Sequence, residues 1–311
     1  MGEETIVVKP VEIDPGCVIG LDDVKTAESR QKKRLMKQLP NGVASDFGCV
    51  HPVPTQLDET TGIRFDFNDG LRLMMPPEDI VWHVTVYNDE TKDVLGKEML
   101  PANSCLVYPI KYYIRYCIHI EGGGKVFEHT MELRGKPVAF KMCQRTLGDP
   151  IALFCNIPYF CQKHNCNAIV YAPERIADIF RNQYPEIDFR LLTEEDTTLP
   201  YATYYLGLFF SSDENNRLYQ PQDWRLFGLQ EQSRNILGLS ERLEAEPPKV
   251  DLSAPRSIPE KYVCISYAGS KACKFWQNAY GWYEVTKYLK SIGYRILCID
   301  RDPVYGPYPT C

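Results

Sequence analysis

Asp149 is the residue of this chain whose type and position best suit acid–base chemistry. It ends the turn Thr146-Leu147-Gly148-Asp149, which follows a strand-like run over 138–143 and precedes a predicted helix. A carboxylate here can accept the proton of an attacking hydroxyl while a bond to an electrophilic sugar carbon forms. The helix dipole favours its ionised form. Aspartate is also a preferred N-cap, and Pro150 suits the first helical position, so helix capping is the competing interpretation.

A second group of candidates lies in KACKFWQNAYGWYEV, residues 271–285, between a predicted strand and a predicted helix. Lys271 and Lys274 could neutralise a diphosphate together with backbone N–H groups at the helix start. Trp276 or Trp282 could stack on a base or a sugar. Solvated lysines and aromatic side chains that cover a core are the alternative interpretation of the same pattern.

The cysteines do not form a recognisable metal site. Cys155, Cys161, His164 and Cys166 are close in sequence, but their C-x5-C-x2-H-x-C spacing matches no zinc pattern, because structural sites favour closely spaced cysteine pairs. We therefore expect no metal ligands among them. Three histidines fall in strand patterns and are predicted to be structural: His83, His119 and His129.

The elements that position these residues divide the chain into five parts. Residues 1–48 are predicted to be an extension, 49–137 an antiparallel β domain and 138–243 a Rossmann-like α/β domain. Residues 244–260 contain several prolines and are predicted to be a linker, and 261–311 begin a second Rossmann-like domain. Two such domains facing each other across a cleft form a GT-B arrangement. The fold class is thus α/β, with a small antiparallel barrel or sheet in front.

Three hairpin-like units define the antiparallel part. Their turns are predicted at 68–70, 88–90 and 122–124. Alternation over 112–120 puts Tyr112, Ile114, Tyr116 and Ile118 on one face of a strand. The other face carries Tyr113, Arg115, Cys117 and His119.

Composition excludes several classes of protein. The 311 residues are 44% hydrophobic and 24% charged, with a net charge of −6, which is ordinary for a globular protein and unlike a basic nucleic-acid binder. There is no apolar run long enough for a membrane span and no secretory signal pattern at the start. Twelve cysteines without an export signal indicate reduced thiols, so we expect a cytoplasmic protein.

Six segments together resemble the bacterial autotransporter heptosyltransferases, over about residues 62 to 306. They are FDFNDG (65–70), RTLGDPIALF (145–154), PYATYYLGLFF (200–210), DLSAPR (251–256), KFWQNAYGW (274–282) and GYRILCIDRD (293–302). The LGD sequence also resembles the opening motif of the lipopolysaccharide heptosyltransferases.

The resemblance implies an inverting GT-B glycosyltransferase with an N-terminal β-barrel. Its donor would be ADP-heptose, and its acceptors Ser or Thr hydroxyls of autotransporter adhesin passenger domains. Asp149 matches the catalytic base and Lys274 the lysine that holds the donor phosphates, while Trp276 and Asn278 share the Lys274 motif. Family members form large homo-oligomers and bind one iron.

The family continues beyond IDRDPVYG with a donor-site segment and a cysteine-rich, iron-binding region, whereas this sequence ends in GPYPTC. We therefore expect a C-terminally truncated second domain, no iron ligands in this chain and weakened donor binding. Two other functions are consistent with the residues. One is a non-catalytic protein that binds passenger domains, and the other is a cysteine-metal redox protein.

Overall fold

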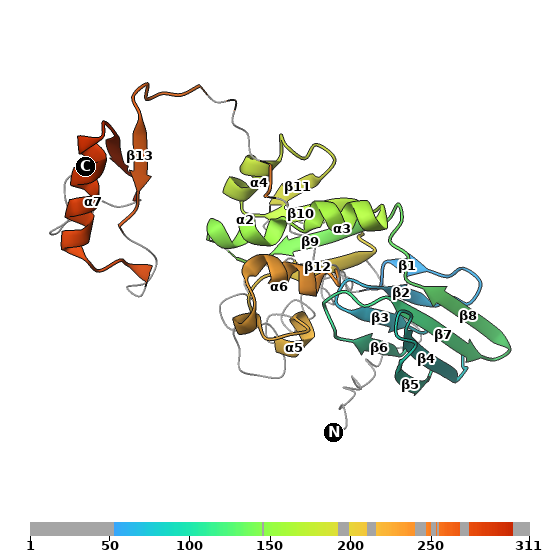
Figure 1. Cartoon of the computed structure of the whole chain (residues 1–311). Helices are drawn as coiled ribbons and strands as arrows, with labels where there is room; N and C mark the ends of the chain where they lie inside the picture. The colour runs from blue at the N-terminus through green and yellow to red at the C-terminus, as the bar shows by residue number, and fades with distance from the viewer. Residues whose placement is uncertain are drawn as a thin grey trace, which may run out of the picture. The chain divides into compact units, whose positions relative to one another are not determined.

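The structure is a computed structural model of the whole chain (Figure 1). It describes residues 53–144, 146–191, 199–209, 216–239, 247–249, 253, 255–267 and 274–300. The chain divides into two compact units, Met1–Asp251 and Leu252–Cys311. The predicted extension over 1–48 and Lys271 lie outside the described residues.

From residue 53 onward, the first unit forms two antiparallel sheets of four strands each, in the orders β1-β2-β3-β6 and β5-β4-β7-β8. The strands are β1 (Gln56–Leu57), β2 (Arg64–Asp66), β3 (Leu71–Met74), β4 (Trp82–Asn88), β5 (Val94–Leu100), β6 (Cys105–Tyr108), β7 (Tyr116–Gly122) and β8 (Lys125–Thr130). The three predicted hairpins are confirmed as the pairs β2–β3, β4–β5 and β7–β8. Alternating apolar side chains explain these sheets, because every second residue of β4 and β7 is buried.

The predicted faces of the segment 112–120 hold only for its second half. Strand β7 begins at Tyr116, and within it Tyr116, Ile118 and Ile120 are buried. Tyr113 lies before the strand and is itself buried, since its N–H donates to the Ile236 carbonyl at 2.8 Å and its ring packs on Phe160. Contacts with a distant helix therefore override the local alternation at this point.

The second half of the first unit is a parallel sheet with strand order β11-β10-β9-β12 (Figure 1). Its strands are β9 (Pro137–Met142), β10 (Asn167–Ala172), β11 (Asp188–Leu191) and β12 (Ala202–Leu206). Strands β9, β10 and β12 are almost continuous runs of buried residues, as expected for parallel strands covered on both faces. The helices are α2 (Gly148–Phe154), α3 (Ile157–His164), α4 (Glu174–Phe180), α5 (Asn216–Tyr219) and α6 (Leu229–Ile236), with a 3₁₀ turn η1 (Trp224–Leu226).

The helix expected after Asp149 is two helices in the structure. Helix α2 ends with Cys155 as its C-cap, and α3 starts at Ile157 with Pro158 in its first turn. Proline has no N–H to donate to the Phe154 carbonyl one turn earlier, and its ring clashes with that carbonyl. Proline is tolerated in a first helical turn, so the chain restarts the helix at this point.

A buried polar network joins the antiparallel part to the parallel sheet, and the FDFNDG segment supplies it. Phe67 forms a parallel bridge with Ala202, the first residue of β12. The Asn68 side chain donates to the Pro200 carbonyl at 2.6 Å and accepts from the Thr203 hydroxyl at 2.8 Å. Asp66 is fully buried and accepts from the Arg72 guanidinium at 2.7 Å. This segment therefore forms a hairpin turn and also joins the antiparallel part to the parallel sheet.

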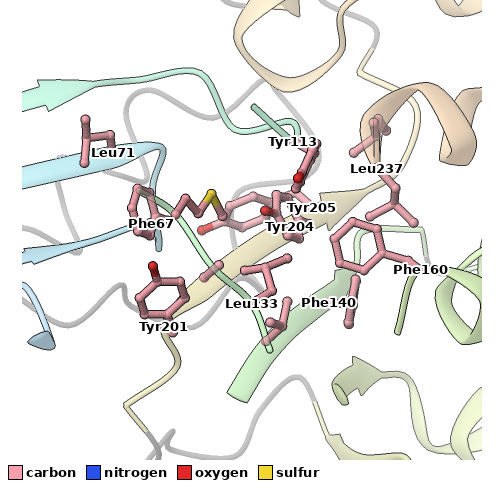
Figure 2. Close-up of a cluster of buried hydrophobic side chains, with 14 of the residues drawn as sticks. Phe67, Leu71, Tyr113, Leu133, Phe140, Phe160, Tyr201, Tyr204, Tyr205 and Leu237 are labelled. Carbon is pink, nitrogen blue, oxygen red and sulfur yellow. The ribbon is translucent and has the colours of Figure 1, made fainter. Parts of the chain in front are cut away.

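Apolar side chains continue the same junction (Figure 2). Phe67 and Leu71 from the antiparallel part belong to one hydrophobic cluster with Tyr204 and Tyr205 of β12 and Phe140 of β9. The first unit thus has one main hydrophobic core that runs through all three sheets.

His129 on β8 is half-buried against aromatic rings of this core and makes the stability of the first unit sensitive to pH. Its ring stacks on Phe127 and its Nε2 atom is 2.8 Å from the Tyr201 hydroxyl, and burial lowers its pKa to about 4. An unfolded histidine has a pKa of about 6.5, so between pH 6.5 and pH 4 the unfolded chain binds a proton that the folded chain does not. We therefore expect the unfolding free energy to fall by about 1–2 kcal/mol, because of His129, when the pH is lowered from 7 to 5.

Urea unfolding followed by circular dichroism at the two pH values tests this expectation. His129→Gln should flatten the loss on acidification, whereas His83→Gln, which removes an exposed imidazole on β4, should keep the wild-type pH dependence. An equal loss in wild type and His129→Gln would contradict it.

The described residues of the second unit form one βαβ element: β13 (Tyr262–Ile265), α7 (Ala279–Ser291) and β14 (Arg295–Cys298). The two strands are parallel, with Tyr262 opposite Arg295. Ile265, Tyr267 and Ile296 form a small core, against which Trp282 and Leu289 of α7 pack.

Candidate active site

The candidate site of the first unit lies where the order of parallel strands reverses. The chain leaves β9, reaches β10 and β11 on one side of it, and then returns to form β12 on the other side. In open α/β sheets, ligands bind at the carboxyl ends of the strands flanking such a reversal. The loops that follow β9 and β12 therefore frame the site.

These two loops are held against each other. The Cys143 N–H donates to the Leu206 carbonyl at 2.8 Å, and the Gln144 side chain donates to the Leu208 carbonyl at 3.2 Å. Gly207 permits this approach, because a Cβ atom there would lie only 2.8 Å from the Cys143 Cβ. Burial raises the pKa of the Cys143 thiol well above its usual value, so this cysteine is unsuited to act as a thiolate nucleophile.

Asp149 lies at the edge of this frame, half-exposed in the first turn of α2. Its Oδ2 atom accepts a hydrogen bond from the Thr146 hydroxyl at 2.8 Å. The predicted alternative, Asp149 as the N-cap, is wrong: Leu147 is the N-cap and no side chain caps this helix. The Thr-x-x-Asp spacing resembles a capping box, but here the hydroxyl bonds to the carboxylate and not to a helix N–H. The Thr146 hydroxyl therefore orients the Asp149 carboxylate, and this carboxylate makes no capping bond to the helix.

The three other predicted site residues come together in the second unit, just before α7. Asn278 is the N-cap of α7 and accepts from the Gly281 N–H at 2.8 Å. The Trp276 ring is 48% exposed and packs edge-on against Trp282, with 5.0 Å between ring centroids. Gly281 is needed beneath it, since a Cβ would lie 2.5 Å from the indole. Lys274 is exposed in the same turn.

We call Lys274, Trp276 and Asn278 the ledge before α7. Together they have the chemistry needed to bind a ligand. An exposed indole offers a face for stacking, a lysine offers positive charge, and the start of a 13-residue helix offers backbone N–H groups. Asp149 belongs to the first unit and these three residues to the second.

The cysteine–histidine group does not assemble into a metal site. The Cys155 thiol donates to the Ala152 carbonyl at 3.0 Å, and the His164 ring packs on Phe160 and Tyr113. Over the whole part of the chain that the structure describes, no three His, Cys, Asp or Glu side chains gather as metal ligands would. The described residues thus do not fit an iron ion, and we assign none of them to one.

Sequence reasoning missed Thr146, Gln144 and Gly207 as parts of the site. Two signals could have found them: the Thr-x-x-Asp spacing in TLGD, and a glycine directly after the buried strand in YYLGLFF.

Among the described helices, none has both the length and the apolar character needed to cross a bilayer.

The chain is similar to several known proteins. Residues 60–124 match the family model described as the N-terminal domain of glycosyltransferase TibC. The chain is 38% identical to the autotransporter heptosyltransferase Aah of Escherichia coli over 82% of its own length and 63% of that protein. It is 37% identical to the autotransporter heptosyltransferase TibC of E. coli O78:H11, over 81% of this chain and 61% of TibC.

Two further similarities bear on the function. The crystal structure of TibC, described as an iron-containing dodecameric glycosyltransferase, superimposes with a TM-score of 0.72 at 36% identity, covering 82% of this chain and 65% of the TibC chain. The inactive autotransporter heptosyltransferase BimC of Burkholderia thailandensis is 33% identical over 78% of this chain and 56% of BimC. The chain thus spans about three fifths of the length of these curated relatives.

Proposed function

This chain belongs to the autotransporter heptosyltransferase family, and we propose that it transfers heptose from ADP-heptose to Ser or Thr hydroxyls of autotransporter passenger domains. The observation that carries the proposal is the oriented, half-exposed carboxylate of Asp149 at the strand reversal of the parallel sheet. A solved complex of the related TibC with ADP-D-β-D-heptose, 35% identical with a TM-score of 0.72, supports the choice of donor.

In the proposed reaction Asp149 is the general base. The acceptor oxygen attacks the anomeric carbon on the face opposite the ADP group, while an Asp149 oxygen takes the hydroxyl proton. The bond from the anomeric carbon to the diphosphate breaks, ADP leaves with the electron pair, and the anomeric configuration inverts. The Thr146 hydroxyl holds Oδ2 of Asp149 and so limits the rotation of the base.

The donor-binding role goes to the ledge before α7. Lys274 would neutralise the diphosphate, Trp276 would stack on the base or the sugar, and Asn278 would keep the start of α7 in place for both. In this proposal residues 138–243 and those from 261 onward are the two domains of a GT-B enzyme, and the antiparallel domain over 49–137 helps to hold the passenger chain.

The cellular setting is part of the same proposal. Donor and passenger would meet in the cytoplasm, and the protein would work as a homo-oligomer, as supported by the dodecameric description of TibC. Iron is described for TibC, but the described residues of this chain do not supply a ligand set for it.

A second function is favoured by the similarity to BimC, which is described as inactive. In that alternative the chain binds passenger domains without transferring sugar. The two functions share the acceptor and differ only in whether heptose is bonded to it.

The purified chain, incubated with ADP-heptose and a purified passenger domain, separates the two. We expect the passenger to gain mass in whole heptose increments on serine and threonine peptides. Passenger that is retained by the immobilised chain without any gain in mass would overturn transfer and support binding alone. Neither retention nor mass gain would contradict both functions.

A further inference from the structure

The C-terminal end of α3 brings two cysteines together. Asn165 has a left-handed backbone conformation, with φ of 49°, which reverses the chain directly after the helix. The Cys166 N–H then donates to the Cys161 carbonyl at 3.2 Å. A left-handed residue followed by this backward bond is a Schellman motif, in which the side chains at the positions of Cys161 and Cys166 typically contact each other.

Both thiols are placed for chemistry with small molecules. Each is free, half-buried and packed beside the main core. The hydrogen bond from Cys161 lowers the pKa of Cys166, whereas it raises the pKa of Cys161. Cys166 therefore resembles an attacking thiol and Cys161 a resolving one.

Neighbouring candidates lack this combination. The Cys155 thiol donates to a carbonyl of its own helix, and burial raises its pKa to about 11. Cys143 is buried in the loop pair of the candidate active site. His164, which lies between the two cysteines in sequence, packs between aromatic rings, so the pair has no third ligand that would make it a metal site.

We propose that Cys161 and Cys166 are a redox modification site that forms a reversible intramolecular disulfide when the protein meets hydrogen peroxide. The Cys166 thiolate attacks one peroxide oxygen, which gives a sulfenic acid and releases the other oxygen as water. The Cys161 sulfur then attacks the sulfenic sulfur, the S–S bond forms, and a second water leaves. The two thiols lose two electrons, and the peroxide is reduced to two waters. A dithiol reverses the change by thiol–disulfide exchange.

The bond would secure the turn between α3 and β10. Asn165 and Asn167, on either side of Cys166, are already tied to Gly135: the Gly135 N–H donates to the Asn165 carbonyl at 2.8 Å, and the Asn167 side chain donates to the Gly135 carbonyl at 3.1 Å. The disulfide would add a covalent tie to this junction, which leads into the strand next to β9.

The test treats the full chain with hydrogen peroxide and digests it with trypsin in the presence of a thiol-blocking reagent. Lys163 lies between the two cysteines, so cleavage there leaves two peptides that a disulfide from Cys166 can join. The peptide that ends at Lys163 also carries Cys155, and the Cys155→Ser variant distinguishes the two pairings. We expect the joined pair in the mass spectrum of the treated chain, its loss after dithiothreitol, and its absence in Cys166→Ser. Cys155→Ser is the matched control and should form the bond as wild type does.

Two results would overturn the proposal. One is that both cysteines stay free or become sulfinic acids independently of each other. The other is that Cys161 or Cys166 pairs instead with another cysteine or with a second chain. Because the peptide pair is detected without any sugar transfer, the outcome does not depend on the proposed glycosyltransferase activity.

Discussion

Asp149→Asn is expected to lower heptose transfer by roughly a thousandfold while passenger binding stays unchanged. Asparagine keeps the size and the hydrogen-bond acceptor that the Thr146 hydroxyl uses, but it cannot take a proton from the acceptor hydroxyl. General bases contribute about 10²–10⁴ in rate, which sets the size of the loss. Initial rates of mass gain on the passenger, at matched ADP-heptose concentrations, measure the effect.

A second variant, at Thr146, should lower the rate by a smaller factor. Thr146→Val removes the hydroxyl that holds Asp149 and should lower the turnover rate by about tenfold with little change in KM, because an unrestrained base is less often in position. Thr146→Ser restores the hydroxyl and should restore the rate.

Transfer by Asp149→Asn at the wild-type rate would remove the catalytic role and leave this carboxylate as a structural feature of α2.

Arg72→Met should lower the unfolding free energy of the first unit by about 3–5 kcal/mol. The Asp66 carboxylate has no exposed surface, and Arg72 binds it with distances of 2.5 and 2.7 Å. Without Arg72 a negative charge remains buried at the junction of the antiparallel and parallel sheets. Urea denaturation monitored by circular dichroism gives the free energy.

The double variant Asp66→Asn/Arg72→Met separates charge burial from packing. It removes both charges and should recover a substantial part of the stability lost in Arg72→Met, because the cost of an unpaired buried ion disappears. Arg225→Met is the matched control, since Arg225 pairs with Asp223 on the surface and its loss should not shift the unfolding midpoint. If Arg72→Met and Arg225→Met behave alike, the junction does not depend on the buried pair.

Local sequence patterns were sufficient for the three hairpins and for the change to an α/β pattern after them, although not for the break between α2 and α3. Period-two alternation and turn residues predict the hairpins, because a strand with one buried face must alternate. Continuous apolar runs such as those around Phe140 and Tyr204 predict parallel strands buried on both faces. The same logic places Asp149 at the first strand-to-helix turn of the α/β part, as found in the structure.

The tertiary structure alone decided which side chains meet. Asn68 finds its partners at Pro200 and Thr203, more than 130 positions away, so no local pattern could show that the FDFNDG turn joins two sheets. Tyr113 is buried by the α6 end and not by its own alternation. The pairing of the Asp149 carboxylate with Thr146 in place of a capping bond also depends on where the α2 helix starts. Periodicity specifies which face of an element is apolar, whereas partners are chosen by long-range packing of whole elements.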